Sequence, residues 1–136
     1  MVIPRIKEKL KKYPHVTYTS APSQLEIPAQ STTGFRVWVQ ELLGRCRVGF
    51  EGWHEEFSNA DTALECFVFG LSTACRLRVF RRGGMDYKWQ VLHHVDGRWI
   101  ADSETGLLWF PFWRKREERE LQNELIKTAC TGSRGD

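Results

Sequence analysis

In several segments of this chain, apolar residues alternate with basic or aromatic ones, as they do along a β-strand. The basic and aromatic set consists of Arg36, Trp38, Arg45, Arg47, Arg76, Arg78 and Phe80, which we call the arginine face. Successive side chains of a strand point to opposite faces of a sheet, so these residues are expected on one face and the apolar residues between them on the other. A guanidinium binds carboxylates and phosphates through its planar fork, and a neighbouring ring can stack on a flat group. The pattern predicts a binding surface for an acidic protein segment or another anionic ligand.

Acidic residues in the same region allow a second interpretation of the arginine face. They nearly balance the basic charge there, and they are Glu41, Glu51, Glu55, Glu56, Asp61, Glu65, Asp86 and Asp96. The arginines would then form cross-strand pairs with carboxylates on a solvated face that binds nothing. Nucleic acid is a less favoured partner, because the net charge is only +3 and the glycine and aromatic signature of an RRM is absent.

Histidine and glutamate side chains form a second candidate site. His54 and Glu55 lie in one expected strand, and His93 or His94 lies in another. Together they could bind a divalent metal or carry out general acid–base chemistry if the two strands were neighbours. Adjacent His93 and His94 must point to opposite faces, however, and the sequence around His54 does not have the spacing of an HExxH zinc helix. A small metal-dependent enzyme is therefore the alternative function, and we assign no catalytic or metal-binding residue.

The remaining composition favours a non-catalytic protein. No nucleophile has a recognisable elbow or partner, and no cofactor motif is present, so we expect no cofactor. Cys46, Cys66, Cys75 and Cys130 form no CxxC pair, and the N-terminus lacks the apolar stretch of a secretory signal, which together favour a cytoplasmic protein. No segment reaches the ~18 apolar residues of a membrane span, so no membrane partner is expected.

A run of apolar residues near the C-terminus exceeds what one short strand can bury. It reads Leu107-Leu108-Trp109-Phe110-Pro111-Phe112-Trp113. Part of this run must cover a sheet end, contact a neighbouring helix or form an interface. Core packing and a surface for self-association both account for it, so a homodimer remains an open alternative.

Two segments have helical periodicity. Ile3, Ile6 and Leu10 recur at steps of three and four, which predicts an amphipathic helix that ends before Pro14. A broader apolar stripe predicts a central core helix over residues 60–73, with Ser58-Asn59 as typical capping residues in front of it.

Period-two alternation predicts the strands. They are expected over residues 16–20 and 25–29 as an edge hairpin, over 35–40 and 45–50, and over 75–80, 87–91 and 98–101 as a meander. Residues 53–57 either continue the strand before them or leave the sheet. Residues 102–106 are expected to form a polar loop and residues 107–110 a last short strand. The charged segment that follows predicts a C-terminal helix, whose thin apolar stripe would be Trp113, Leu121 and Leu125.

These elements predict an α+β fold, with a single domain over residues 1–128 and a flexible C-terminal tail over residues 129–136. We expect one curved antiparallel sheet of about six to eight strands with a central helix and N- and C-terminal helices. The order would be helix, four strands, helix, three or four strands, helix. The expected function is that of a small cytoplasmic, non-catalytic binding or adaptor domain whose arginine face takes an anionic or acidic partner.

Overall fold

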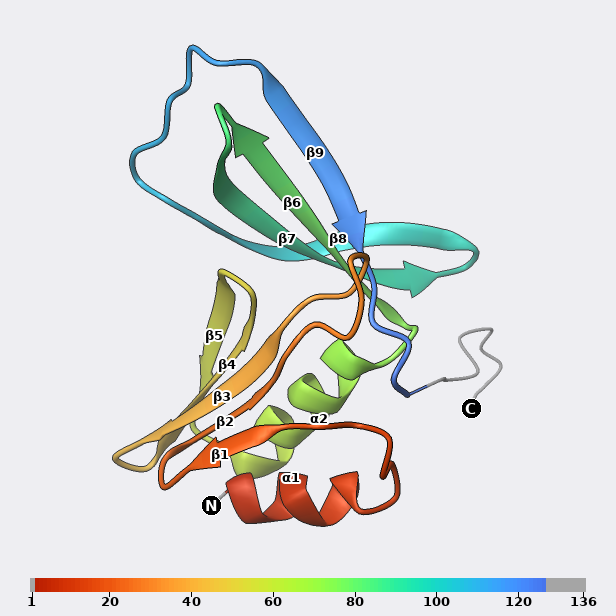
Figure 1. The fold of residues 1–136 in the computed structure, drawn as a ribbon. Coiled ribbons are helices and arrows are strands. Elements are labelled where there is room, and N and C mark those ends of the chain that lie inside the picture. Colours follow the sequence, from red (N-terminus) through yellow and green to blue (C-terminus); the bar gives the residue numbers. More distant parts are fainter. Residues whose placement is uncertain (1, 127–136) are drawn as a thin grey trace.

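The computed structural model describes residues 2–126, which form two helices and two antiparallel sheets (Figure 1). The helices are α1 (Ile3–Leu10) and α2 (Ala60–Leu71). The first sheet has the order β1-β2-β3-β4-β5 and consists of β1 (Thr19–Ala21), β2 (Gln24–Ile27), β3 (Val37–Leu42), β4 (Arg45–Phe50) and β5 (Trp53–Phe57). The second has the order β8-β7-β6-β9 and consists of β6 (Cys75–Arg82), β7 (Met85–Val95), β8 (Arg98–Gly106) and β9 (Arg116–Leu121).

The predicted α+β class with antiparallel pairing is confirmed, but the strands form two sheets where one was expected. In the first sheet each strand pairs with the next along the chain. After β5 the chain enters α2. β6 then pairs with β7 and β9 in the second sheet and not with a strand of the first. Alternation fixes which residues share a face of a strand but not which strands pair, so the sequence pattern did not separate the two sheets.

Both helices expected in the first part of the chain are confirmed. α1 buries Ile3, Ile6 and Leu10 on one side and ends at Leu10, before Pro14. The side chain of Asn59 caps α2 by accepting hydrogen bonds from two backbone N–H groups of the first turn, as the sequence predicted.

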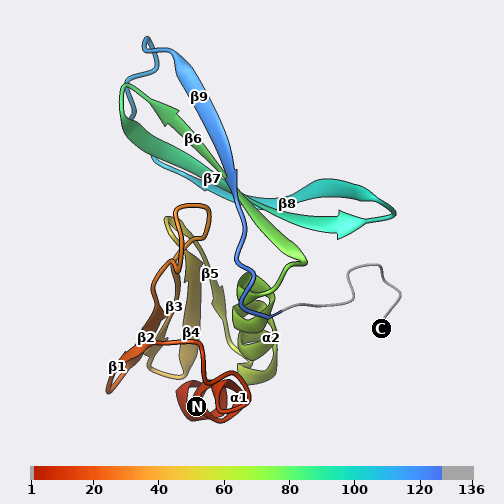
Figure 2. The ribbon, with the colours of Figure 1, turned by 45° about the vertical axis from the view of Figure 1, so that its right-hand side comes forward.

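α2 packs against the inner face of the five-stranded sheet (Figure 2). Gly70 faces Phe50 of β4, and a methyl group in place of the Gly70 hydrogen would overlap the phenyl ring. The missing side chain therefore allows the helix to approach the sheet this closely.

The expected C-terminal helix is wrong, because residues 116–121 form β9 and pair antiparallel with β6. Residues 102–106, expected as a loop, are the second half of β8, which pairs with β7 as far as Gly106. The strand expected over residues 107–110 is irregular. β9 exposes every residue except Leu121, so it has no apolar alternation from which a strand could be recognised.

One hydrophobic core connects the two sheets, since apolar side chains of both belong to the same buried cluster. Trp89 of β7 lies against Gly52 in the β4–β5 turn. Trp53 of β5 donates a hydrogen bond from Nε1 to Ser103 Oγ of β8 over 2.8 Å. These contacts set β5 beside β7 and β8.

The tail expected over residues 129–136 lies outside the described residues, and the domain bounds stay a prediction. Neither α1 nor α2 is long and apolar enough to cross a membrane.

Candidate functional site

The structure divides the arginine face between the two sheets. Trp38, Arg45 and Arg47 lie in the five-stranded sheet, with Arg36 directly before β3, and Arg76, Arg78 and Phe80 lie in the four-stranded sheet. The residues therefore form two separate groups instead of one continuous surface.

Carboxylates pair with the arginines of the five-stranded sheet. The Nη1 atom of Arg36 lies 3.3 Å from Glu26 Oε1. Glu56 on β5 contacts both Arg45 and Arg47, with N–O distances of 3.7 and 2.6 Å. The hydrogen bond from Arg47 stabilises the charged carboxylate and so lowers the pKa of Glu56 below its ordinary value.

Trp38 is held by its own sheet. Its indole covers Gly49 of β4, and its Nε1 atom donates to the backbone oxygen of Glu51 over 3.0 Å. The ring of His54 lies beside it, with centroids 6.4 Å apart. Trp38 is consequently half-buried and fixed in orientation.

A single carboxylate pairs with both arginines of the four-stranded sheet. Glu120 of β9 lies 3.3 Å from Arg76 Nη1 and 2.9 Å from Arg78 Nη2. The guanidinium of Arg76 also lies over the ring of Trp99, 4.2 Å from its centroid. Every arginine of the predicted face thus has a carboxylate partner, which is the arrangement of the second interpretation.

Phe80 lies beneath two cations and is only 4% exposed. Lys88 Nζ lies 4.4 Å from the ring centroid, and the guanidinium of Arg116 lies 5.4 Å from it. The ring therefore supports these two cations and offers no open face of its own for stacking.

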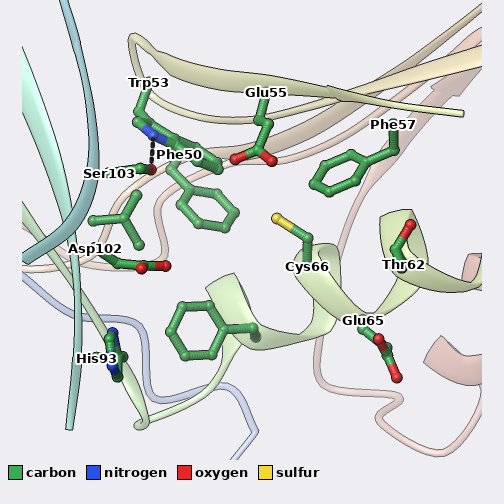
Figure 3. Close-up of a pocket in the computed structure, with 12 residues that line it drawn as sticks. Phe50, Trp53, Glu55, Phe57, Thr62, Glu65, Cys66, His93, Asp102 and Ser103 are labelled. Atoms are coloured by element: carbon green, nitrogen blue, oxygen red, sulfur yellow. Dashed lines mark hydrogen bonds between the residues drawn. The ribbon is translucent and has the colours of Figure 1, made fainter.

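The histidine and glutamate candidates separate across the faces of their strands. Glu55 and His93 line one pocket of about 570 Å³ between β5, α2, β7 and β8 (Figure 3). His54 lies on the other side of β5, next to Trp38. His94 lies against Trp99, with ring centroids 5.1 Å apart. Within residues 2–126 no group of three His, Cys, Asp or Glu side chains could hold a metal ion.

The pocket is mainly aromatic with a few polar groups at its sides. Its apolar walls come from Phe50, Trp53, Phe57, Phe69 and Val91. Glu55 and Asp102 direct their carboxylates into it, whereas Glu65 points away (Figure 3). Burial, with a smaller contribution from Glu55, raises the pKa of Cys66 to about 12. The Cys66 thiol is therefore protonated at neutral pH and is a poor nucleophile.

A third group of residues lies at the end of the four-stranded sheet that is remote from both helices (Figure 1). The connection between β8 and β9, residues 107–115, exposes five large apolar side chains, and we call it the aromatic loop. They are Leu107 (42% exposed), Leu108 (105%), Trp109 (63%), Phe112 (68%) and Trp113 (63%).

The aromatic loop is fixed to the sheet at defined points. Arg82 of β6 donates from Nη1 to the backbone oxygens of Phe112 and Arg114, over 3.0 and 2.8 Å. Phe110 turns inward and stacks on Tyr87 of β7, with ring centroids 4.2 Å apart. The exposed rings are therefore presented by an ordered connection.

Cations without acidic partners surround the aromatic loop. Arg114 and Lys115 in the loop, and Lys88 beside it, form no ion pair with any residue of the described part of the chain. Among the described residues, the guanidinium of Arg82 bonds to carbonyl and hydroxyl oxygens and lies over the ring of Tyr87. Arg116, directly after the loop, pairs with Glu118 over 3.6 Å. We call the aromatic loop together with Lys88 and Arg116 the distal surface. The sequence contained its signal, since residues 105–116 include three consecutive basic residues and no acidic one.

Comparisons of the chain with protein-family models, with curated proteins and with solved structures gave no match.

Proposed function

We propose that this protein is a non-catalytic binding domain for an anionic partner, and that it engages this partner through the distal surface. One observation carries the proposal: the arginines of the predicted face are paired with carboxylates, whereas Arg114, Lys115 and Lys88 at the aromatic loop form no ion pair among the described residues. An unpaired cation is available to a ligand without first breaking an internal ion pair. The partner is thus still the anionic one predicted from the sequence, but the distal surface binds it in place of the arginine face.

The apolar residues of the distal surface support the same proposal. Monomeric proteins seldom expose several large apolar side chains together, and such patches commonly mark interaction sites. Trp and Arg are also the side chains most enriched among residues that dominate binding energies. The combination of Trp109, Trp113 and Arg114 is therefore better suited to binding than to a solvated loop.

Salt-gradient elution from a sulfonate cation-exchange resin tests where the anion-binding surface lies. Arg114→Glu/Lys115→Glu should elute at clearly lower salt than the native protein. Lys7→Glu/Lys9→Glu changes the net charge equally on the exposed side of α1, and Arg76→Gln/Arg78→Gln removes the paired arginines. Lys7→Glu/Lys9→Glu should shift elution less, because those lysines lack an aromatic neighbourhood. Arg76→Gln/Arg78→Gln changes the net charge half as much as the distal variant and should shift elution by less than half as much, because those arginines already share the carboxylate of Glu120.

Equal shifts for the distal and α1 variants would mean that only net charge matters, and the proposal would fail. A larger shift for Arg76→Gln/Arg78→Gln than for the distal variant would return the binding surface to the arginine face.

A further inference from the structure

We propose, on the basis of the proposed function, that the partner of the distal surface is an anionic phospholipid membrane. The aromatic loop would insert its exposed rings into the headgroup region, while the surrounding cations contact lipid phosphates and carboxylates. Such peripheral contact needs no membrane-spanning segment, so the expectation of no membrane partner, which was derived from the lack of a span, does not bear on it.

The apolar side chains of the loop match the interfacial layer of a bilayer. Trp109 and Trp113 combine a large apolar ring with a polar N–H group, and tryptophan is enriched where hydrocarbon meets headgroups. Leu107 and Leu108 are exposed next to them and can enter the layer beneath. The exposed rings of this loop can therefore insert into such a layer.

The charges of the loop match an anionic lipid surface. Arg114, Lys115 and Arg116 follow directly after the last tryptophan, and Lys88 lies on the neighbouring strand β7. Basic residues next to inserted apolar side chains are attracted by the negative potential of phosphatidylserine and similar lipids. No acidic residue occurs between residues 105 and 116, but Glu104 and Glu117 flank this stretch. Because Glu118 pairs with Arg116 over 3.6 Å, the attraction depends mainly on the cations without an ion pair, Arg114, Lys115 and Lys88.

The anchoring of the loop lowers the cost of insertion. The bonds from Arg82 to Phe112 and Arg114, together with the stack of Phe110 on Tyr87, order the loop before it meets a partner. Less conformational freedom is then lost on binding.

A second copy of the chain fits the distal surface less well than an anionic membrane does. A two-fold dimer would place the distal surface against itself, because the same patch of both subunits meets at such an interface. The cations Arg114 and Lys115 of one subunit would then face those of the other. Like charges brought together in this way oppose association.

Vesicle co-sedimentation of the full chain tests the proposal. The probes are vesicles of phosphatidylcholine alone and of phosphatidylcholine with phosphatidylserine in a ratio of about 3:1. The native protein should bind the anionic vesicles at least ~10-fold more tightly than the neutral ones, and Arg114→Glu/Lys115→Glu should remove this preference.

A matched pair of leucine variants tests insertion itself. Leu107→Ala/Leu108→Ala should reduce binding to anionic vesicles several-fold. Leu42→Ala/Leu43→Ala removes leucines of nearly the same exposure, 48% and 105%, at the β3–β4 turn and should leave binding unchanged. Thermal melting of all variants shows whether they are folded, and neither pair lies in the buried core.

Four results would overturn the membrane proposal. The first is equal loss of binding in the two leucine variants, and the second is the absence of vesicle binding while the protein binds a polyglutamate peptide through Arg114 and Lys115. The second result would leave the proposed function intact and identify an acidic protein as the partner. The third is a concentration-dependent dimer in sedimentation analysis that Leu107→Ala/Leu108→Ala abolishes. Failure to bind both vesicles and polyglutamate would overturn the membrane proposal and the proposed function together.

Discussion

Phe110 stacks on Tyr87 with ring centroids 4.2 Å apart and ring planes 17° apart. Phe110 is the ring of the aromatic loop that turns toward the sheet, whereas Trp109, Phe112 and Trp113 on either side of it face solvent. The run of aromatic residues is therefore divided between one anchor and several exposed rings. Packing, one interpretation of the run, applies to Phe110, whereas self-association through the exposed rings stays a prediction.

Arg82→Gln should loosen the aromatic loop. The substitution removes the guanidinium that bonds to the backbone oxygens of Phe112 and Arg114, at a cost of about 1 kcal/mol in the free energy of unfolding. Hydrogen exchange followed by mass spectrometry should show faster exchange in residues 107–115. Arg81→Gln is the matched control, because Arg81 bonds to Asp86 and not to the loop. Similar acceleration by both variants would contradict this role of Arg82.

Gly70→Ala should destabilise the protein although alanine favours helices. The added methyl group overlaps the ring of Phe50, and overpacking of this kind costs about 1–3 kcal/mol. Urea unfolding measures the loss. The double variant Gly70→Ala/Phe50→Leu should be less impaired than the sum of its single changes, since the smaller side chain makes room for the methyl group. Strict additivity would show that the close approach of α2 to β4 does not limit this position.

Cys66 should resist alkylation at neutral pH and make stability depend on alkaline pH. Burial raises the pKa of its thiol to about 12 in the folded protein, against 9.0 for an ordinary thiol. The unfolded chain therefore loses this proton first as the pH rises, and the free energy of unfolding decreases from about pH 9 toward pH 12. Iodoacetamide labelling with mass spectrometry, with and without urea, tests the first effect.

Urea unfolding of the native protein and of Cys66→Ala at several alkaline pH values tests the second effect. The variant should show a smaller decrease in stability with pH. Rapid labelling of Cys66 in the folded protein at neutral pH would argue against a largely shielded, protonated thiol.

Addition of Zn²⁺ or Mn²⁺ should leave the melting temperature unchanged. Glu55 and His93 share a pocket, but His54 lies on the opposite side of β5, so the predicted His–Glu group is not assembled. A metal that bound the folded state alone would raise the melting temperature. A rise that His93→Ala abolishes would instead support the metal-dependent alternative.

The parts of the fold that follow from local periodicity were predictable. The stripe of Ile3, Ile6 and Leu10 gave α1, the Asn59 cap gave the start of α2, and the alternation around Val37 gave the β3–β4 hairpin. The pairing of β6 with β9 depends on contacts between segments far apart in the chain, and no local period encodes it. Tertiary pairing therefore overrode the helical spacing that the C-terminal segment has by itself.

The site was predictable only in part. Alternation correctly placed Arg76 and Arg78 on one face of β6, and the balance of acidic residues anticipated that the arginines pair with carboxylates. The identity of their partner, Glu120, could not be foreseen, because it lies in the segment expected to be helical. Exposure of the aromatic run also could not be derived from its composition, which suits a core equally well.

β9 is an edge of the four-stranded sheet, and its exposed residues from Arg116 to Glu120 are all charged. A strand from another molecule could add to this edge only by laying its own side chains beside that row of charges. Alternate pairing of this kind is the first step toward amyloid-like aggregation, and charged edge strands oppose it. β9 lacks the apolar alternation by which a strand is recognised in a sequence. The charged residues that stand in its place also oppose the addition of another strand to the sheet.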